Sequence, residues 1–232
     1  MVDDLIEISV KPNGESGGLS FKKRLTLVLL LGLIGAWWFF FKLGSSEIFI
    51  PFWGLLNIGW LVIPLFVSVM VILFSSSVID GIDGLAGGVM AIIFAAYAGI
   101  AFFQNQIDLS AFSAVLAGGT LAFLWFNIPP ARFYMSETGI LGLTTTLTVI
   151  AFLTDSVVIL PLIAFPLFAT VVSNIIQLGS KHLRNGKKVF LVAPLHHHFE
   201  AIGWPAYKIT MRYWIIGIIT AIIGMIIILI GH

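Results

Sequence analysis

The sequence predicts an all-α fold: a polytopic membrane helical bundle of about seven transmembrane helices, forming one membrane domain over residues 1–232. Of the 232 residues, 59% are hydrophobic and 10% are charged. The mean hydropathy is +1.07. These values are typical of integral membrane proteins. Apolar runs long enough to cross a bilayer recur along the chain. No internal repeat or linker divides it.

The predicted spans follow from these runs, because crossing the hydrocarbon core takes roughly 17–25 mainly apolar residues. The fifth run is short and rich in threonine, so we expect neighbouring helices to cover it. Residues 1–24 are polar and lack the apolar core of a signal peptide, so the first run is expected to be an uncleaved anchor. In chain order, the runs are 25–41, 58–79, 85–104, 111–128, 139–153, 156–178 and 210–231.

Basic residues predict the orientation, because the cytoplasmic ends of spans carry an excess of Lys and Arg. Lys22, Lys23 and Arg24 precede the first span and put the N-terminus in the cytoplasm. If the spans alternate from there, Lys42 is the one residue among the twelve Lys and Arg that lies outside. The loop 179–209 is then cytoplasmic.

Composition excludes several classes of function. The chain has no cysteine, which rules out disulfides, thiolate metal sites and a cysteine nucleophile. A net charge of +1 gives no reason to expect a nucleic-acid partner.

Two aspartates follow the second span, in the stretch VIDGIDGLAGG. A carboxylate beside hydrocarbon is costly and usually functional. On a helix, Asp80 and Asp83 would share a face, and their hard oxygens suit Mg²⁺, which binds one or two carboxylates together with substrate phosphates. The alternative is a loop in which Asp80 caps the third span.

Three further acids fall on the same predicted face. Asp3 and Asp4 are adjacent, so one could ligate a metal or act as a base while the other orients it; the alternative is a solvated terminus. Glu137 precedes the fifth span. Either Ser136 caps that helix and Glu137 is a first-turn acid, or the helix N-terminus favours a bound phosphate.

Polar and aromatic residues flank Glu137. Arg132 could hold a diphosphate, and the Tyr134 ring offers a stacking surface for a base or sugar. Asn127, at the end of the fourth span, could face a site or satisfy a helix end.

Three consecutive histidines, His196, His197 and His198, lie in the cytoplasmic loop. In a helix they would point in three directions, so an extended loop after Pro194 is predicted. They lack the i, i+4 spacing of a helical zinc pair, and contacts to phosphate or a sugar fit better. The preceding basic strip is either a positive-inside signal or a contact for anionic membrane lipid or a lipid phosphate; it comprises Lys181, Arg184, Lys187 and Lys188.

Three ordered motifs carry a resemblance across essentially the whole chain: VIDGIDGLAGG, FLWFNIPPARFYMSETG and VFLVAPLHHHFEAIGWP followed by MRYW. In the residues and order of these three motifs, the chain resembles the phospho-N-acetylmuramoyl-pentapeptide transferases (translocase I). They are a branch of the polyprenyl-phosphate N-acetylhexosamine-1-phosphate transferases. The histidine motif is similar to that of the muropeptide branch, although Ala206 stands at its usual glutamate. Relatives that use UDP-N-acetylglucosamine have an H-x-H-H type motif.

The resemblance implies a reaction at a bacterial cytoplasmic membrane, with the active site facing the cytoplasm. UDP-N-acetylmuramoyl-pentapeptide would pass its phospho-sugar to undecaprenyl phosphate, giving lipid I and UMP, with Mg²⁺ as cofactor. Catalytic roles would fall on Asp3, Asp4, Asp80, Glu137 and His196, with Asp80 and Glu137 also holding the metal. Substrate-binding roles would fall on Asp83, Asn127, Tyr134, His197 and His198.

The chain departs from the family pattern in several places. Glu137 and Ser136 replace the aspartate and glycine of M-G-D-x-G, and Phe74 and Ser77 replace two asparagines. The family has ten spans and seven are predicted here, so three spans are expected to be missing at the N-terminus. The expectations therefore include a homodimer, a complementing N-terminal fragment, a UDP-N-acetylglucosamine-type transferase, and a truncated non-catalytic homologue.

Overall fold

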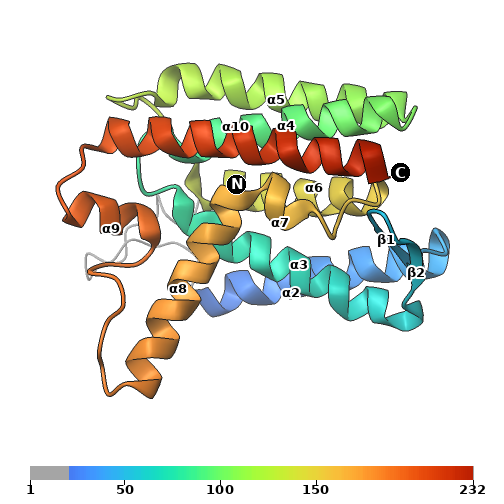
Figure 1. Ribbon diagram of the computed structural model, residues 1–232, viewed down its shortest axis with the longest axis horizontal. Coiled ribbons are helices and arrows are strands. Elements are labelled where there is room, and N and C mark those ends of the chain that lie inside the picture. The colour runs from blue at the N-terminus through green and yellow to red at the C-terminus, as the bar shows by residue number, and fades with distance from the viewer. Residues whose placement is uncertain (1–20, 232) are drawn as a thin grey trace.

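The computed structural model describes residues 21–231, apart from the side chains of Phe21 and Glu137 (Figure 1). Its α-helices are α2 (Phe21–Trp37), α3 (Val62–Ser75), α4 (Leu85–Phe103), α5 (Ile107–Asn127), α6 (Ser136–Leu153), α7 (Leu160–Ile163), α8 (Phe165–Leu183), α9 (Leu195–Ala201) and α10 (Ala206–Gly231). A π-helix, η1 (Trp38–Lys42), extends α2, and the 3-10 helices η2 (Gly59–Leu61) and η3 (Ser76–Ile79) flank α3. Strands β1 (Glu47–Ile50) and β2 (Gly54–Asn57) form one antiparallel hairpin.

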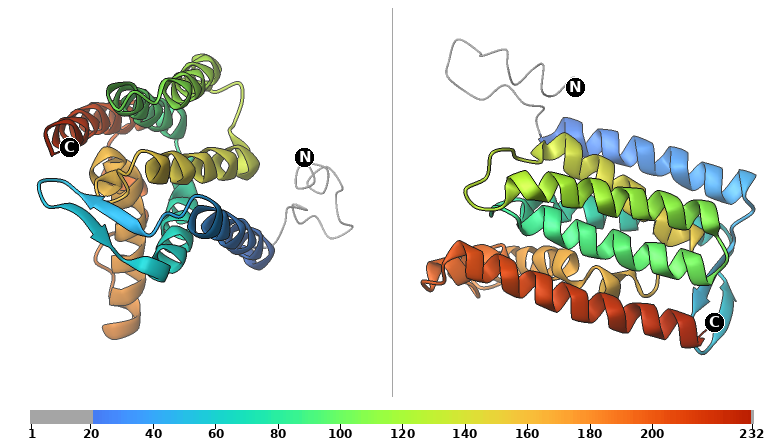
Figure 2. Two further views of the ribbon diagram at one scale, coloured as in Figure 1. Left: turned by 90° about the vertical axis from the view of Figure 1, so that its right-hand side faces the viewer. Right: turned by 90° about the horizontal axis from the view of Figure 1, so that it is seen from above.

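The long helices lie side by side, and their connections alternate between two ends (Figures 1 and 2). At one end, here called the α9 end, lie the loop 80–84, the loop 128–135, α9 and the start of α2. At the other, the hairpin end, lie the hairpin and the C-terminal end of α10. Helix α8 leaves the bundle at a steep angle and leads toward α9.

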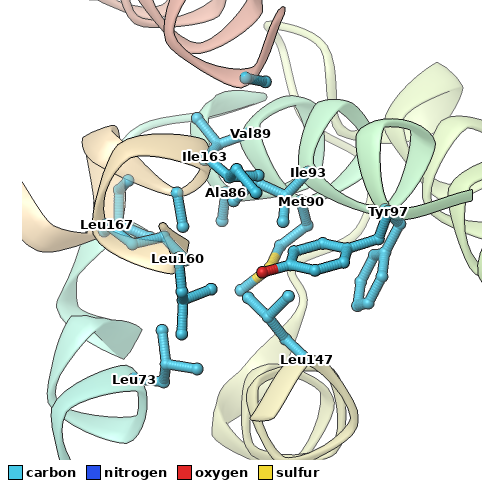
Figure 3. Packing of buried hydrophobic residues seen from close by; sticks show 14 of the residues in the cluster. Leu73, Ala86, Val89, Met90, Ile93, Tyr97, Leu147, Leu160, Ile163 and Leu167 are labelled. Atoms are coloured by element: carbon cyan, nitrogen blue, oxygen red, sulfur yellow. The ribbon is translucent and has the colours of Figure 1, made fainter. Parts of the chain in front are cut away.

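Helix α4 forms the centre of the bundle. Of its membrane-spanning window 67% is buried, against 22% for α5 and for α10. Its large side chains pack with α6, α7 and α3 in the main core, where Met90, Tyr97, Leu147 and Leu160 meet (Figure 3). A second core joins α2 to α3, and there Gly35 lets the Phe66 ring approach the α2 backbone closely.

The outer faces of the peripheral helices are apolar and exposed. Leu30 and Ile34 on α2, Val115 on α5 and Ile219 on α10 are examples. In water such contiguous apolar surface would drive association, whereas in a bilayer it is matched to the lipid tails. The fold is therefore an all-α, multi-pass membrane bundle.

Five helices in the described part of the chain are long and apolar enough to cross a membrane: Lys22–Lys42, Gly59–Ile79, Leu85–Phe103, Ile107–Asn127 and Ala206–Gly231. They overlap the first four and the last of the predicted runs. The fifth run falls within α6, whose apolar part, Thr138–Leu153, is shorter.

The sixth predicted run is not one helix. It divides into α7 and α8 at Ala164, whose backbone angles are non-helical (φ −100°, ψ 32°). Pro166 lies in the first turn of α8. Proline has no backbone N–H to donate, so it is tolerated in a first turn but would interrupt one continuous helix over this run. The break redirects α8 out of the bundle.

Two elements differ from the sequence-based expectation. The hairpin was not predicted, although EIFI and GLLN flank a short Pro-Phe-Trp turn. The extended loop predicted for the histidines is wrong, because residues 195–201 form α9. Pro194 occupies the N-cap position of α9, and its carbonyl accepts hydrogen bonds from the N–H groups of His197 and His198.

Candidate functional site

Asp80 and Asp83 lie in the turn 80–84 between η3 and α4. They therefore do not share a helix face, and the helical spacing considered for them does not apply. Gly84 adopts the left-handed conformation (φ 77°) at the N-cap of α4, with no side-chain cap. Glycine adopts this conformation without steric cost, so the turn can reverse the chain at the end of the bundle.

Asn127 joins this turn to the next loop. Its side-chain oxygen accepts a hydrogen bond from the N–H of Gly84 (3.0 Å), and its amide nitrogen donates to the carbonyl of Phe133 (2.7 Å). The residue is 1% exposed. The buried Asn127 side chain thus links the turn 80–84 to the loop 128–135, which favours a role in holding these segments and not in touching substrate. Its predicted contact with substrate stays a prediction.

Further contacts fix the turn on three sides. The Asp83 carboxylate accepts a hydrogen bond from the N–H of Ala131 (3.1 Å). On α10, Thr210 donates to the main-chain carbonyl of Asp83 (3.2 Å), and the Trp214 indole donates to that of Gly84 (3.1 Å). The aspartate turn is therefore held to both α5 and α10 through main-chain groups.

Asp80 occupies a half-buried position beside a second carboxylate. Burial, and then the negative charge of Asp83, raise the pKa of Asp80 from its ordinary 3.8 to about 6. A cation placed at this turn would offset both effects. The turn is thus electrostatically suited to a positively charged ligand.

Helix α9, which carries the three histidines and is called the histidine helix below, packs against the same turn. A Cβ on Gly81 would lie 2.8 Å from Nε2 of His197 and 3.2 Å from Nε2 of His196. Only glycine at this position lets both rings rest on the loop main chain between the two aspartates. The rings of His196 and His197 are 4.4 Å apart.

His196 points inward and is fully buried. Neither of its ring nitrogens has a hydrogen-bond partner within the described residues. Burial, and then the neighbouring His197, lower the pKa of His196 to about 4. His196 is therefore a neutral imidazole at neutral pH.

The other two histidines are held by local partners. Nδ1 of His197 lies 2.6 Å from the Glu200 carboxylate, and Nδ1 of His198 accepts a hydrogen bond from the N–H of Leu191 (3.2 Å). Helix α8 braces this region through Gln177, whose side chain bonds both the N–H and the carbonyl of Phe190. The α9 helix is thus fixed relative to α8.

The loop 128–135 presents exposed side chains beside the turn. Tyr134 is 72% exposed, and Arg132 is also exposed. Of the two readings of this segment, the one in which Ser136 caps α6 is wrong: the N-cap position is Met135, without a side-chain cap. Ser136 instead adopts a left-handed φ of 44°, a conformation that favours the glycine of the family motif.

The structure thus brings together the turn of Asp80 and Asp83, the loop bearing Tyr134, and the three histidines. Glu137 lies in the first turn of α6, but its side chain, like Asp3 and Asp4, lies outside the described part of the chain. Within that part, no group of three or more His, Asp or Glu could hold a metal ion. Sequence reasoning gave no role to Glu200, Thr210 or Trp214, although EAIGWP and MRYW adjoin the histidines.

An apolar groove lies beside α9, between α8 and the segment that precedes α9. Its volume is about 420 Å³. Phe165, Phe168, Val172 and Ile176 line it on α8, and Phe190 and Leu195 close it. Its lining is almost entirely carbon, so it suits a hydrocarbon chain.

These features define a class: a multi-pass helical membrane protein with a polar site where a turn, a loop and a histidine helix meet at one end of the bundle. A sequence profile described as glycosyl transferase family 4 matches residues 1–155. The chain belongs to this family, and it is a transferase homologue.

Its relatives are similar over nearly the whole chain. Proteins named phospho-N-acetylmuramoyl-pentapeptide-transferase from Anoxybacillus flavithermus, Pelagibacter ubique and Caldanaerobacter subterraneus are 37%, 33% and 35% identical to it. The matches cover 97%, 96% and 96% of this chain, and 68%, 66% and 69% of those proteins. The chain thus spans about two thirds of the length of these relatives.

Proposed function

We propose that this protein transfers phospho-N-acetylmuramoyl-pentapeptide from its UDP conjugate to undecaprenyl phosphate, giving lipid I and UMP. The observation that carries the proposal is the convergence of the aspartate turn, the Tyr134 loop and the histidine helix at one end of a membrane bundle. The names of the similar proteins support this substrate pair. A soluble nucleotide and a lipid acceptor can meet only at such a membrane surface.

The donor set fits Mg²⁺. The aspartate turn offers hard carboxylate oxygens, and burial, followed by the negative charge of Asp83, raises the pKa of Asp80, a cost that a bound cation would offset. Mg²⁺ commonly takes one or two carboxylates and completes its shell with water and substrate phosphate. In this proposal Asp80 and Glu137 hold the ion, which when bound neutralises charge on the reacting phosphates.

The remaining residues position the substrates, which is the main task in phosphoryl transfer. The exposed Tyr134 ring stacks on the uracil, and Asp3 and Asp4 orient the lipid phosphate and keep it deprotonated. Asp83 fixes the loop 128–135 through its bond to Ala131, and Asn127 acts in the same way. His196 offers a neutral imidazole beside the turn, and His197 and His198 border the sugar-phosphate.

The apolar groove along α8 supports the lipid acceptor. It lies next to α9, so a polyprenyl chain in the groove would bring its phosphate toward the aspartate turn. The acceptor would thus be bound by a carbon-lined surface and reach the reaction centre through its head group.

The proposed orientation places the α9 end in the cytoplasm of a bacterial inner membrane. Among the described basic residues, Lys42 alone sits beside the hairpin, and the others belong to segments at the α9 end. The native chain has no cysteine, so single-cysteine variants can test this directly. A membrane-impermeant maleimide should label Trp53→Cys in intact cells and Ile202→Cys only after lysis; the reverse pattern would overturn the orientation.

The test of function is an assay on membranes containing the protein expressed from its full coding sequence. With UDP-N-acetylmuramoyl-pentapeptide, undecaprenyl phosphate and Mg²⁺ it should release UMP and form lipid I, and Asp80→Asn should not. Preference for UDP-N-acetylglucosamine in a donor competition would redirect the proposal to the related transferases. No product with either donor would favour a non-catalytic homologue. A homodimer or a complementing N-terminal fragment stays a prediction.

A further inference from the structure

One acidic side chain at the site has no role in the reaction described above. Glu200 lies on α9, three residues after His197, and its carboxylate oxygen is 2.6 Å from Nδ1 of that ring. Both side chains are partly exposed, at 34% for His197 and 37% for Glu200. A hydrogen bond this short, between a ring N–H and a carboxylate, has a defined direction: Nδ1–H donates and the carboxylate accepts.

The other nitrogen of the same ring faces the aspartate turn. Nε2 of His197 is the atom nearest to where a Cβ of residue 81 would lie, at 2.8 Å. The imidazole therefore bridges from Glu200 to the main chain between Asp80 and Asp83. Which ring nitrogen carries the proton is set by the hydrogen bond that the other one makes.

The helix that carries both residues is firmly anchored. The Phe199 ring stacks on Trp204 with centroids 4.8 Å apart and an interplanar angle of 16°. The Arg212 guanidinium lies 4.1 Å from the centroid of the Trp204 ring. This three-layer stack ties α9 to α10, so the orientation of His197 is a property of the fold and not of a free surface side chain.

We propose that Glu200 is a positioning residue for His197: it holds the proton on Nδ1 and so presents the unprotonated Nε2 at the aspartate turn to a hydroxyl or amide N–H of the donor sugar. The proposal rests on the proposed function and deepens it. A lone pair on Nε2 accepts hydrogen bonds, so it recognises a donor group and not a phosphate oxygen. His197 then reads the N-acetyl sugar, whereas the diphosphate is held by other groups.

The first test needs no activity. In the full chain labelled with ¹⁵N-histidine, nitrogen shifts should place the His197 proton on Nδ1, with the signal assigned through His197→Asn. Glu200→Met keeps the side-chain length but removes the acceptor, and should shift the proton toward Nε2. Glu200→Gln retains an acceptor oxygen and should preserve the wild-type tautomer. An unchanged tautomer in Glu200→Met would overturn the proposal.

The second test separates sugar recognition from nucleotide recognition. Glu200→Met should raise KM for the UDP-sugar about fivefold, the size expected for one neutral hydrogen bond, while the Kd for UMP stays within twofold. Glu47→Met, the same change on β1 at the hairpin end, should leave both constants unaltered. Equal weakening of UMP and donor by Glu200→Met would overturn the proposal. An inactive wild type would instead count against the proposed function, and the tautomer would still report on Glu200.

Discussion

Asn127 offers the sharpest test of how the candidate site is held together. Asn127→Ala leaves the Gly84 N–H without its acceptor and the Phe133 carbonyl without its donor. The buried Gly84 N–H left unpaired costs about 1–3 kcal/mol, and the partly buried Phe133 carbonyl adds a smaller amount, so the variant should lose about 1–4 kcal/mol of unfolding free energy. In a chain of this size that corresponds to a fall in the unfolding midpoint of roughly 2–16 °C.

The assay is thermal unfolding of purified protein in detergent, followed by circular dichroism, with hydrogen exchange at the Gly84 amide as a local readout. Asn57→Ala is the matched control, because the Asn57 side chain also accepts a main-chain N–H, from Gly59, but at an exposed position. Asn127→Asp keeps the acceptor and loses the donor, and should fall below wild type as well. If Asn127→Ala unfolds within 1 °C of the Asn57→Ala control, the two Asn127 hydrogen bonds do not hold the loops together.

Three further outcomes are expected. Because the pKa of Asp80 is raised to about 6 in the fold, protonated Asp80 stabilises the metal-free fold below about pH 4, and this stability is lost as pH rises through about 6. In EDTA, the unfolding midpoint of Asp80→Asn should therefore rise relative to that of wild type between pH 4 and pH 8. A difference in midpoint that stays constant with pH would contradict this. The pKa of His196 is lowered to about 4 in the fold, so the unfolding midpoint of wild type should fall relative to that of His196→Phe as pH falls from 6.5 to 4. Midpoints of the two proteins that change equally with pH would refute this. Gly88→Ala would drive a Cβ into the Trp214 indole and should cost about 1–3 kcal/mol of unfolding free energy, whereas Gly118→Ala, where the added Cβ meets nothing within 4 Å, should cost none.

Hydropathy predicted the long helices well, because an apolar run of spanning length has few alternatives to a membrane helix. It failed where local backbone geometry decided the outcome. The run 156–178 is apolar throughout, but Pro166 and the non-helical Ala164 divide it. The short strands β1 and β2 carry too few residues for a periodic signal.

The candidate site was predictable in its residue types but not in its construction. Acids and histidines stood out because they are rare in an apolar chain. Their relative positions depend on contacts that spacing does not encode, such as Thr210 with the carbonyl of Asp83. The helical form of α9 was missed, because three consecutive histidines on a helix point in three directions, and this favoured an extended loop after Pro194. In the fold His197 bonds Glu200 and His198 bonds Leu191, whereas His196 is buried without a hydrogen-bond partner among the described residues.

The aspartate turn also constrains how the protein is made. The side chains of Asn127, Thr210 and Trp214 bond the main chain of this turn across sequence separations of 43, 127 and 130 residues, respectively. Helices enter the membrane in order of synthesis, so the partners on α10 arrive last. A nascent chain arrested before that point would carry every acid of the turn without the braces that set its shape. The turn then reaches the shape described here only after α10 has been inserted.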